Sequence, residues 1–192
     1  MTQLLPCVEV EAGVRATASV IWLHGLGADG HDFEPLVPHM KLPHVRFVFP
    51  NAPAIPITIN GGFVMPGWYD IRNLELSPHV KDREDPAQIR RSADAITALL
   101  ARERERSVPP DRIVLAGFSQ GGAMANYVAP RHPERLAGYM VLSAYELLIG
   151  SGGDERLHDR RHQGAPALAV GFVRANLFAC FFGKDFRAAA GA

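Results

Sequence analysis

Cysteine is nearly absent from this chain of 192 residues, which contains only Cys7 and Cys180. These two cysteines make no spacing motif. They therefore predict reduced thiols and a cytoplasmic location.

The chain also lacks an excess of charge and a long apolar run. Its 20 basic and 20 acidic side chains cancel, which argues against a nucleic-acid or anionic-membrane partner recognised by bulk charge. No apolar run approaches the roughly 20 residues of a membrane span. The first residues, MTQLLPCVEVEAGV, lack the basic start and apolar centre of a signal peptide.

Short apolar runs are what the sequence does contain. They are nearly continuous, with no clean alternation of polar and apolar residues, as is typical of strands buried on both faces of a parallel sheet. Four such runs occupy residues 18–25, 44–53, 112–119 and 136–144.

Helical patterns lie between these runs. Residues 85–106 carry an apolar face, with Asp85 predicted as the N-cap and Pro86 at the first helical position. Residues 119–129 form a second predicted helix and residues 33–40 a weaker third, interrupted by proline. Alternating strands and helices predict one α/β domain over residues 1–192, a three-layer sandwich with a mostly parallel sheet.

The last part of the chain differs in texture. From about residue 146 the composition changes. Residues 150–166 are polar and typical of a loop, whereas residues 167–173 and 177–182 could each form a strand. The final residues, RAAAGA, are typical of a frayed end.

A serine between two glycines, in Gly117-Phe118-Ser119-Gln120-Gly121, marks the junction of a predicted strand and a predicted helix. A Gly-x-Ser-x-Gly turn in that context presents a nucleophilic serine hydroxyl at the end of the sheet. The helix N-terminus behind it favours negative charge. The alternative is a glycine-rich turn with a capping serine.

A second glycine-rich turn, HGLGADG at residues 24–30, follows the first predicted strand. In this architecture one backbone N–H from such a turn pairs with that of the residue after the serine to form an oxyanion hole. The candidates are the amides of Leu26 and Gln120. His24 precedes the serine beside a strand end, so we expect it to hold the loop by hydrogen bonds rather than to act as the base.

Five blocks of sequence carry a family resemblance. WLHGLGADGHDF, FPNAP, ITINGGFVMPGWYDI, DRIVLAGFSQGGAMA and RHPERLAGYMVLSAY resemble, in order and spacing, the carboxylesterase and acyl-protein thioesterase family of α/β-hydrolases. The similarity covers roughly residues 1–145. It implies a Ser-Asp-His triad that hydrolyses carboxylic esters or thioesters without a metal or organic cofactor, with Ser119 at the nucleophile position.

The resemblance also suggests how substrate is held. Met65 and Trp68 match a loop near the family's substrate channel and could line an acyl pocket, although ordinary core packing explains Trp68 equally well. Asp70 does not match the family's acid, so we expect a structural carboxylate. A small acyl ester or thioester is the implied substrate, and a homodimer through exposed apolar patches is left open.

The sequence departs from the family where the triad's acid and base would lie. Neither the aspartate block nor the C-terminal Gly-His pair is present. Histidines after Ser119 are His132, which matches a helix end, and His158 and His162 in a charged segment with Asp154 and Asp159 nearby. Asp185, two residues after Gly183, is a weak match to the family's aspartate block.

Two functional hypotheses follow from this departure. A reading-frame change near residue 145 would explain the abrupt end of similarity, leaving a divergent tail over residues 146–192 and a truncated family member. One hypothesis is therefore a serine hydrolase with activity weakened or lost, because removal of a triad base leaves only roughly 10³–10⁴ of rate enhancement over water. The other is a non-catalytic remnant or binding protein with an α/β-hydrolase core.

Overall fold

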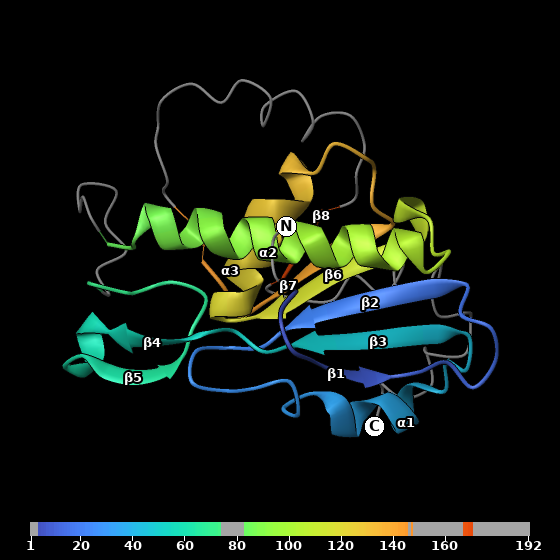
Figure 1. Cartoon of the computed structure of the whole chain (residues 1–192), viewed down its shortest axis with the longest axis horizontal. Coiled ribbons are helices and arrows are strands. Elements are labelled where there is room, and N and C mark those ends of the chain that lie inside the picture. Colours follow the sequence, from blue (N-terminus) through green and yellow to red (C-terminus); the bar gives the residue numbers. More distant parts are fainter. Residues whose placement is uncertain (1–3, 74–82, 146, 148–166, 171–192) are drawn as a thin grey trace.

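The computed structural model describes residues 4–73, 83–145, 147 and 167–170. A six-stranded sheet forms the centre of the molecule, in the order β1-β3-β2-β6-β7-β8 (Figure 1). Its strands in chain order are β1 (Cys7–Val10), β2 (Ala18–Leu23), β3 (Val45–Pro50), β6 (Ile113–Phe118), β7 (Gly138–Leu142) and β8 (Ala167–Val170).

The sheet is mostly parallel, as the apolar runs predict. Strand β2 pairs in parallel with both β3 and β6, β6 with β7, and β7 with β8. The exception is the edge strand β1, which pairs antiparallel with β3 and which the sequence pattern did not reveal. The α/β class with a mostly parallel sheet is therefore confirmed.

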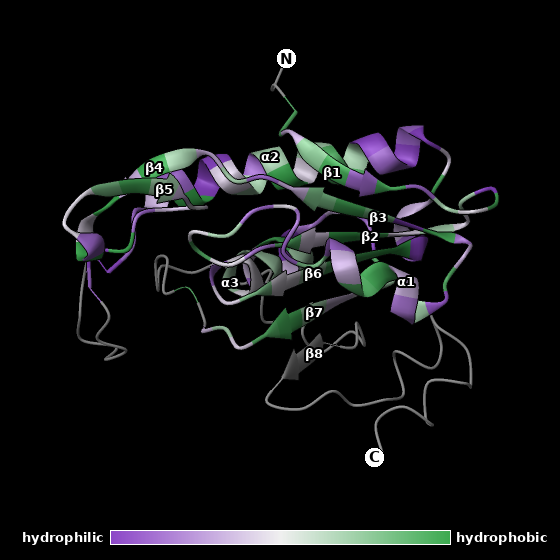
Figure 2. Cartoon of the chain, turned by 90° about the horizontal axis from the view of Figure 1, so that it is seen from below, coloured by the Kyte–Doolittle hydropathy of each residue, from purple (hydrophilic) through white to green (hydrophobic). Residues whose placement is uncertain are grey.

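Both faces of the sheet are buried, which explains why its strands lack alternation. Alternate residues of β2 show this directly, because Ile21 and Leu23 belong to one hydrophobic cluster and Val20 and Trp22 to the other. All four are at most 5% exposed. Figure 2 shows hydrophobic residues along β3 and β7 and recurring hydrophilic residues along helix α2.

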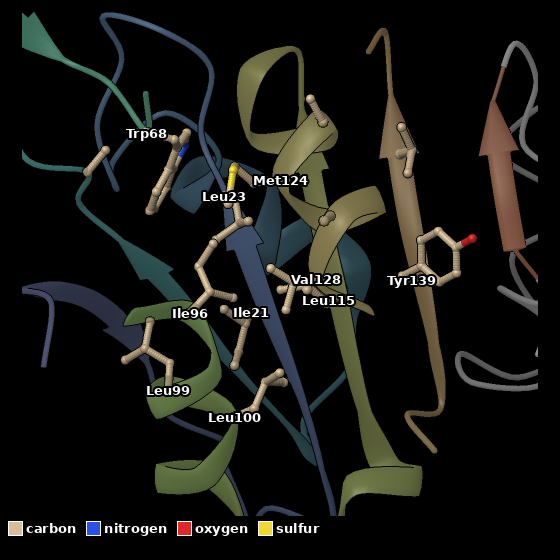
Figure 3. Packing of buried hydrophobic residues seen from close by; sticks show 14 of the residues in the cluster. Ile21, Leu23, Trp68, Ile96, Leu99, Leu100, Leu115, Met124, Val128 and Tyr139 are labelled. Carbon is tan, nitrogen blue, oxygen red and sulfur yellow. The ribbon is translucent and has the colours of Figure 1, made fainter. Parts of the chain in front are cut away.

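Two helices cover the first face. Helix α2 (Pro86–Glu105) and helix α3 (Gln120–Val128) pack onto it, with Ile96, Leu99 and Met124 facing β2 and β6 (Figure 3). As predicted, Asp85 is the N-cap of α2, and its side chain accepts hydrogen bonds from the amides of Ala87 and Gln88. Short 3-10 turns precede β6 (η3, Pro110–Arg112) and follow α3 (η4, Ala129–Arg131).

The opposite face is covered by a shorter segment. The predicted helix over residues 33–40 is divided into a 3-10 turn, η1 (Glu34–Leu36), and one helical turn, α1 (Val37–Met40). Prolines at the start of both pieces explain the division, because proline lacks the N–H that a continuous helix requires. Phe33, Val37 and Met40 pack against this face.

A two-stranded hairpin projects beyond the main sheet (Figure 1). It consists of β4 (Ala54–Ile57), η2 (Thr58–Asn60) and β5 (Phe63–Pro66), and the sequence pattern did not predict it. Gly61 and Gly62 make its turn with φ of 66° and 79°, values that favour glycine. The hairpin places Met65 close to the end of β2.

Strand β8 lies within the segment predicted as a strand at residues 167–173, and it pairs with β7 from Tyr139↔Ala167 to Leu142↔Val170. The second predicted strand, at 177–182, lies outside the described residues, as does the polar segment at 150–166. Among the described residues no helix is long and apolar enough to cross a membrane.

Candidate active site

Ser119 occupies a strained backbone bend between β6 and α3. Its φ and ψ are 52° and −118°, a conformation that L-residues rarely adopt. Its amide donates to Leu142 O at 2.8 Å, so the neighbouring strand β7 holds the bend. The residue is half-buried. This is the strand-to-helix context in which a serine hydroxyl is presented at the end of a sheet.

Gly117 and Gly121 must be glycines because a Cβ at either position would overlap neighbouring backbone atoms. A Cβ on Gly117 would lie 2.2 Å from the carbonyl oxygen of Gly121, and a Cβ on Gly121 would lie 2.4 Å from Leu23 O and 2.5 Å from His24 O. These neighbours are backbone atoms that no rotamer change can move. The first glycine therefore permits the close approach of β6 to the start of α3, and the second permits the close approach of α3 to the end of β2.

The turn after β2 lies directly beside the serine. A Cβ placed on Gly25 would lie 3.5 Å from the Cβ of Ser119. The Leu26 side chain packs over Gly67, since a Cβ placed there would lie 3.1 Å from Leu26 Cδ1. The Gly27 amide donates to Pro66 O at 2.8 Å, whereas the Leu26 amide makes no hydrogen bond to any described residue.

Gln120 contributes the other candidate amide. It is the first residue of α3, and the first amides of a helix have no intrahelical acceptor. Anionic groups are stabilised at such a position. The structure thus brings Ser119, Gln120 and the 24–27 turn together.

His24 holds this turn, as expected. The Ala52 amide donates to His24 Nε2 at 3.0 Å, so that nitrogen carries no proton. The Nδ1–H of His24 therefore donates to Gly25 O, 2.7 Å away. Burial lowers the pKa of His24. A neutral ring with both nitrogens engaged is unsuited to take a proton from Ser119.

Trp68 lies under the same turn, at one end of the hydrophobic cluster (Figure 3). It is 1% exposed, and its indole Nε1–H donates to His24 O at 2.9 Å. Its backbone amide donates to Gln120 Oε1 at 2.8 Å. This burial favours the core interpretation of Trp68 over a position in the wall of an open pocket.

Met65 sits on the other side of the turn. Its Sδ would lie 3.6 Å from a Cβ on Gly27, and the residue is half-buried. The thioether also accepts a hydrogen bond from Asn60 at 3.5 Å. Met65 is therefore adjacent to the candidate oxyanion turn.

Asp70 is a structural carboxylate, as expected. It accepts hydrogen bonds from the Thr58 amide at 2.7 Å and from the Thr58 hydroxyl at 2.6 Å. These bonds tie the turn of the β4–β5 hairpin to the segment that carries Trp68.

No hydrogen bond joins the Ser119 hydroxyl to a base among the residues that the structure describes. Beyond His24, His31 pairs with Glu34 at 2.6 Å, and His132 contacts Glu134 O from the end of η4, the helix-end position predicted for it. The other predicted candidates lie outside the described residues: His158, His162, Asp154, Asp159 and Asp185.

Sequence reasoning missed the side-chain role of Gln120. Its carboxamide bonds the backbone of Trp68 and Tyr69, about fifty residues earlier in the chain. No local pattern signals such a contact, because the Gly-x-Ser-x-Gly motif leaves the identity of that residue open.

Comparisons with known proteins agree with this geometry. The family model described as phospholipase/carboxylesterase matches residues 6–151. The acyl-protein thioesterase 1 of Neurospora crassa is 43% identical over 148 residues, which cover 74% of this chain and 60% of that protein. The protein of the same name from Schizosaccharomyces pombe is 40% identical over 146 residues, which cover 76% and 63%.

Solved structures give the same picture. The acyl-protein thioesterase 2 of Zea mays superposes with a TM-score of 0.63 at 26% identity, covering 81% of this chain and 66% of that one. Esterase PE8 superposes with a TM-score of 0.62 at 29% identity, covering 76% and 66%. The chain spans about three fifths of the length of the curated relatives it matches.

A family match over most of the chain thus coincides with a strained serine at the junction of β6 and α3 and a glycine-rich turn beside it. The chain belongs to the phospholipase/carboxylesterase family of α/β-hydrolases.

Proposed function

We propose that this chain is a serine hydrolase that cleaves carboxylic esters or thioesters through Ser119. The observation that carries the proposal is the strained backbone of Ser119, with φ of 52°, held at the carboxyl end of β6 beside Gly25. Strain of this kind persists where the surrounding structure enforces it, and it is concentrated at functional sites.

In the proposed reaction the Ser119 hydroxyl oxygen attacks the acyl carbonyl carbon. The amides of Leu26 and Gln120 stabilise the oxyanion that forms. Collapse of the intermediate releases an alcohol or thiol and leaves an acyl-serine, which water then hydrolyses to a carboxylic acid. The proton of the hydroxyl must pass to a base and return to the leaving group.

Met65 is proposed to contact the acyl group, and Trp68 is proposed to act from the core beneath it. Met65 is half-buried beside the oxyanion turn and offers a flexible apolar surface. Trp68 is 1% exposed, so its proposed contribution is to support the turn at residues 24–27 through its hydrogen bond to His24 O and not to contact the acyl chain. The named relatives are acyl-protein thioesterases, so thioesters are the first substrates to test. A cytoplasmic location, a homodimer and the lack of a nucleic-acid partner stay predictions from the sequence.

A second function is favoured by one observation. His24 engages both ring nitrogens with backbone groups, and no other described histidine bonds Ser119. A non-catalytic binding protein with an α/β-hydrolase core, or a hydrolase reduced to the rate that the oxyanion hole alone supports, would have this arrangement.

The experiment exposes the purified full chain to a fluorophosphonate probe, p-nitrophenyl acetate and butyrate, and a short acyl thioester. Ser119→Ala removes the proposed nucleophile. Ser107→Ala is the matched control, because Ser107 also has a positive φ, of 70°, but lies after α2. Labelling and hydrolysis that only Ser119→Ala abolishes support the hydrolase. Intact protein that neither labels nor turns over substrate supports the binding protein.

A further inference from the structure

The side chain of Gln120 makes two hydrogen bonds that its place in the motif does not require. Oε1 accepts from the Trp68 amide at 2.8 Å, and Nε2 donates to Tyr69 O at 2.7 Å. Gln120 is 1% exposed. The carboxamide therefore fixes the first residue of α3 against the backbone of residues 68–69.

Trp68 continues this connection to the other side of the candidate site. Its indole Nε1–H donates to His24 O at 2.9 Å, and the His24 ring donates to Gly25 O at 2.7 Å. Gly25 C=O and Leu26 N–H belong to the same planar peptide unit. A hydrogen bond to that carbonyl therefore fixes the direction in which the Leu26 amide points.

We propose that the Gln120 side chain is a positioning group for the oxyanion hole, coupling the Gln120 amide to the Leu26 amide through Trp68 and His24. This inference rests on the proposed function of those two amides. Gln120 then has two roles: its backbone amide donates to the oxyanion, and its side chain fixes the position of that amide.

The proposal depends on how little displacement the hydrogen-bond donors of an oxyanion hole tolerate. Its donors must lie within hydrogen-bond distance of a developing charge, and a displacement of about 1 Å can cost on the order of 10²-fold in rate. Buried hydrogen bonds connected in series also polarise one another. The middle of this connection is rigid, because the Ser92 hydroxyl donates to Trp68 O at 2.5 Å.

Gln120→Leu removes both hydrogen bonds at similar volume. We expect fluorophosphonate labelling of Ser119 to slow by on the order of 10²-fold, with kcat for p-nitrophenyl butyrate falling and KM nearly unchanged. Gln88→Leu is the matched control. Gln88 Oε1 accepts from the Asp70 amide at 2.7 Å, so this variant removes a glutamine bond to the same segment outside the proposed connection, and it should label at close to the wild-type rate.

Gln120→Glu tests the positioning role through the pH dependence of the labelling rate, which a purely structural role of Gln120 would leave unchanged. A carboxylate keeps an acceptor for the Trp68 amide but repels Tyr69 O, whereas the protonated acid restores a donor there. Burial favours the protonated form. The labelling rate of Gln120→Glu relative to wild type should therefore rise as pH falls, and this variant also serves if Gln120→Leu does not fold.

An activity-independent readout is the indole N–H resonance of Trp68. The chain has two tryptophans, so two indole signals are expected, and Trp22→Phe assigns them. Gln120→Leu should shift the Trp68 signal and speed its exchange with solvent, and Gln88→Leu should not. Equal slowing of labelling in both glutamine variants, or an unchanged Trp68 signal in Gln120→Leu, overturns the inference.

Failure of the proposed function gives a different result. A wild-type chain that never labels at Ser119 contradicts the hydrolase, and the coupling of Gln120 to Trp68 is then decided by the indole signal alone. A wild-type chain that labels, together with Gln120→Leu that labels equally fast, contradicts only the positioning role.

Discussion

Ser119 and Leu142 are joined by a backbone hydrogen bond of 2.8 Å from the serine amide to the leucine carbonyl. The bond extends the pairing of β6 with β7 one residue beyond its last register pair, Phe118↔Leu142. The bend at the candidate nucleophile is therefore held by the neighbouring strand as well as by its own glycines, and Ser143 follows Leu142 with a φ of 49°.

Gly121→Ala should damage both stability and the candidate site. The added Cβ would lie 2.4 Å from Leu23 O and 2.5 Å from His24 O, so α3 must move away from the turn that carries Leu26. We expect a loss of about 1–3 kcal/mol in the free energy of unfolding and slower fluorophosphonate labelling. Urea denaturation and labelling rates measure the two effects.

Gly13→Ala is the control for this substitution, because its Cβ would meet neighbours only at 3.9 Å. It should leave labelling unchanged. A Gly121→Ala protein with wild-type stability and labelling would contradict the close packing of α3 against the end of β2.

Asp85→Ala should destabilise helix α2. The carboxylate accepts from the amides of Ala87 and Gln88, and loss of such a cap costs about 1 kcal/mol. These hydrogen bonds lower the pKa of Asp85 from its ordinary 3.8. The contribution is therefore complete above pH 3.8 and disappears as the pH falls through the lowered pKa. Urea denaturation of both proteins from pH 7 downward measures this difference.

Asp85→Asn separates the cap from charge, since asparagine caps helices as well as aspartate but cannot pair with Arg72, whose Nη2 lies 2.7 Å from the carboxylate. Its stability should stay close to wild type at pH 7. A loss as large as that of Asp85→Ala would assign the effect to the ion pair.

Glu103→Ala should be strongly destabilising. Glu103 is 0% exposed, and its carboxylate accepts from Ser19 at 2.7 Å and from Arg46 at 2.9 Å. Removing it leaves the largely buried Arg46 cation with the exposed Glu11, 3.0 Å away, as its remaining carboxylate partner. Breaking a buried ion pair costs up to about 3–5 kcal/mol, and Glu11 should offset part of that loss. Chemical denaturation gives the value.

The comparison for Glu103 is Glu134→Ala. Its partner Arg104 lies 2.8 Å away, with side-chain exposures of 57% for Arg104 and 47% for Glu134. Exposed pairs of this kind contribute about 0–1 kcal/mol. Similar losses in the two variants would contradict a special contribution from burial.

Cys7 should react slowly with iodoacetamide. Burial raises the pKa of the Cys7 thiol to about 11, and the thiolate is the reactive form. In a Cys180→Ser background, alkylation at pH 8 should be on the order of 10²-fold slower in the folded protein than in urea. The rate should increase up to a pH of about 11. Equal rates in the folded and unfolded protein would show an accessible, ordinary thiol.

Local chemistry explains the parts of the fold that the sequence predicted. The runs that became β2, β3, β6 and β7 are apolar on both faces because both faces are buried. Asp85 and Pro86 mark the start of α2 because a free carboxylate acceptor and a missing N–H suit that position. The helix at 33–40 was predicted less well, since its prolines divide it.

The remaining elements depend on partners far along the chain. Strand β1 is only four residues long and half-buried, so its place at the sheet edge follows from pairing with β3 rather than from its own pattern. The β4–β5 hairpin is short and largely exposed, with Phe63 68% exposed, so no buried periodicity marked it.

The sequence by itself determined the strand-to-helix bend at Ser119 and the glycine-rich turn at residues 24–30, because those features depend on which residues tolerate a given backbone angle or close approach. Only the tertiary structure decided that the Gln120 side chain reaches Trp68 and Tyr69 and that His24 Nε2 accepts a hydrogen bond from the Ala52 amide. Such contacts join segments separated by tens of residues, and their geometry exists only once the layers have packed.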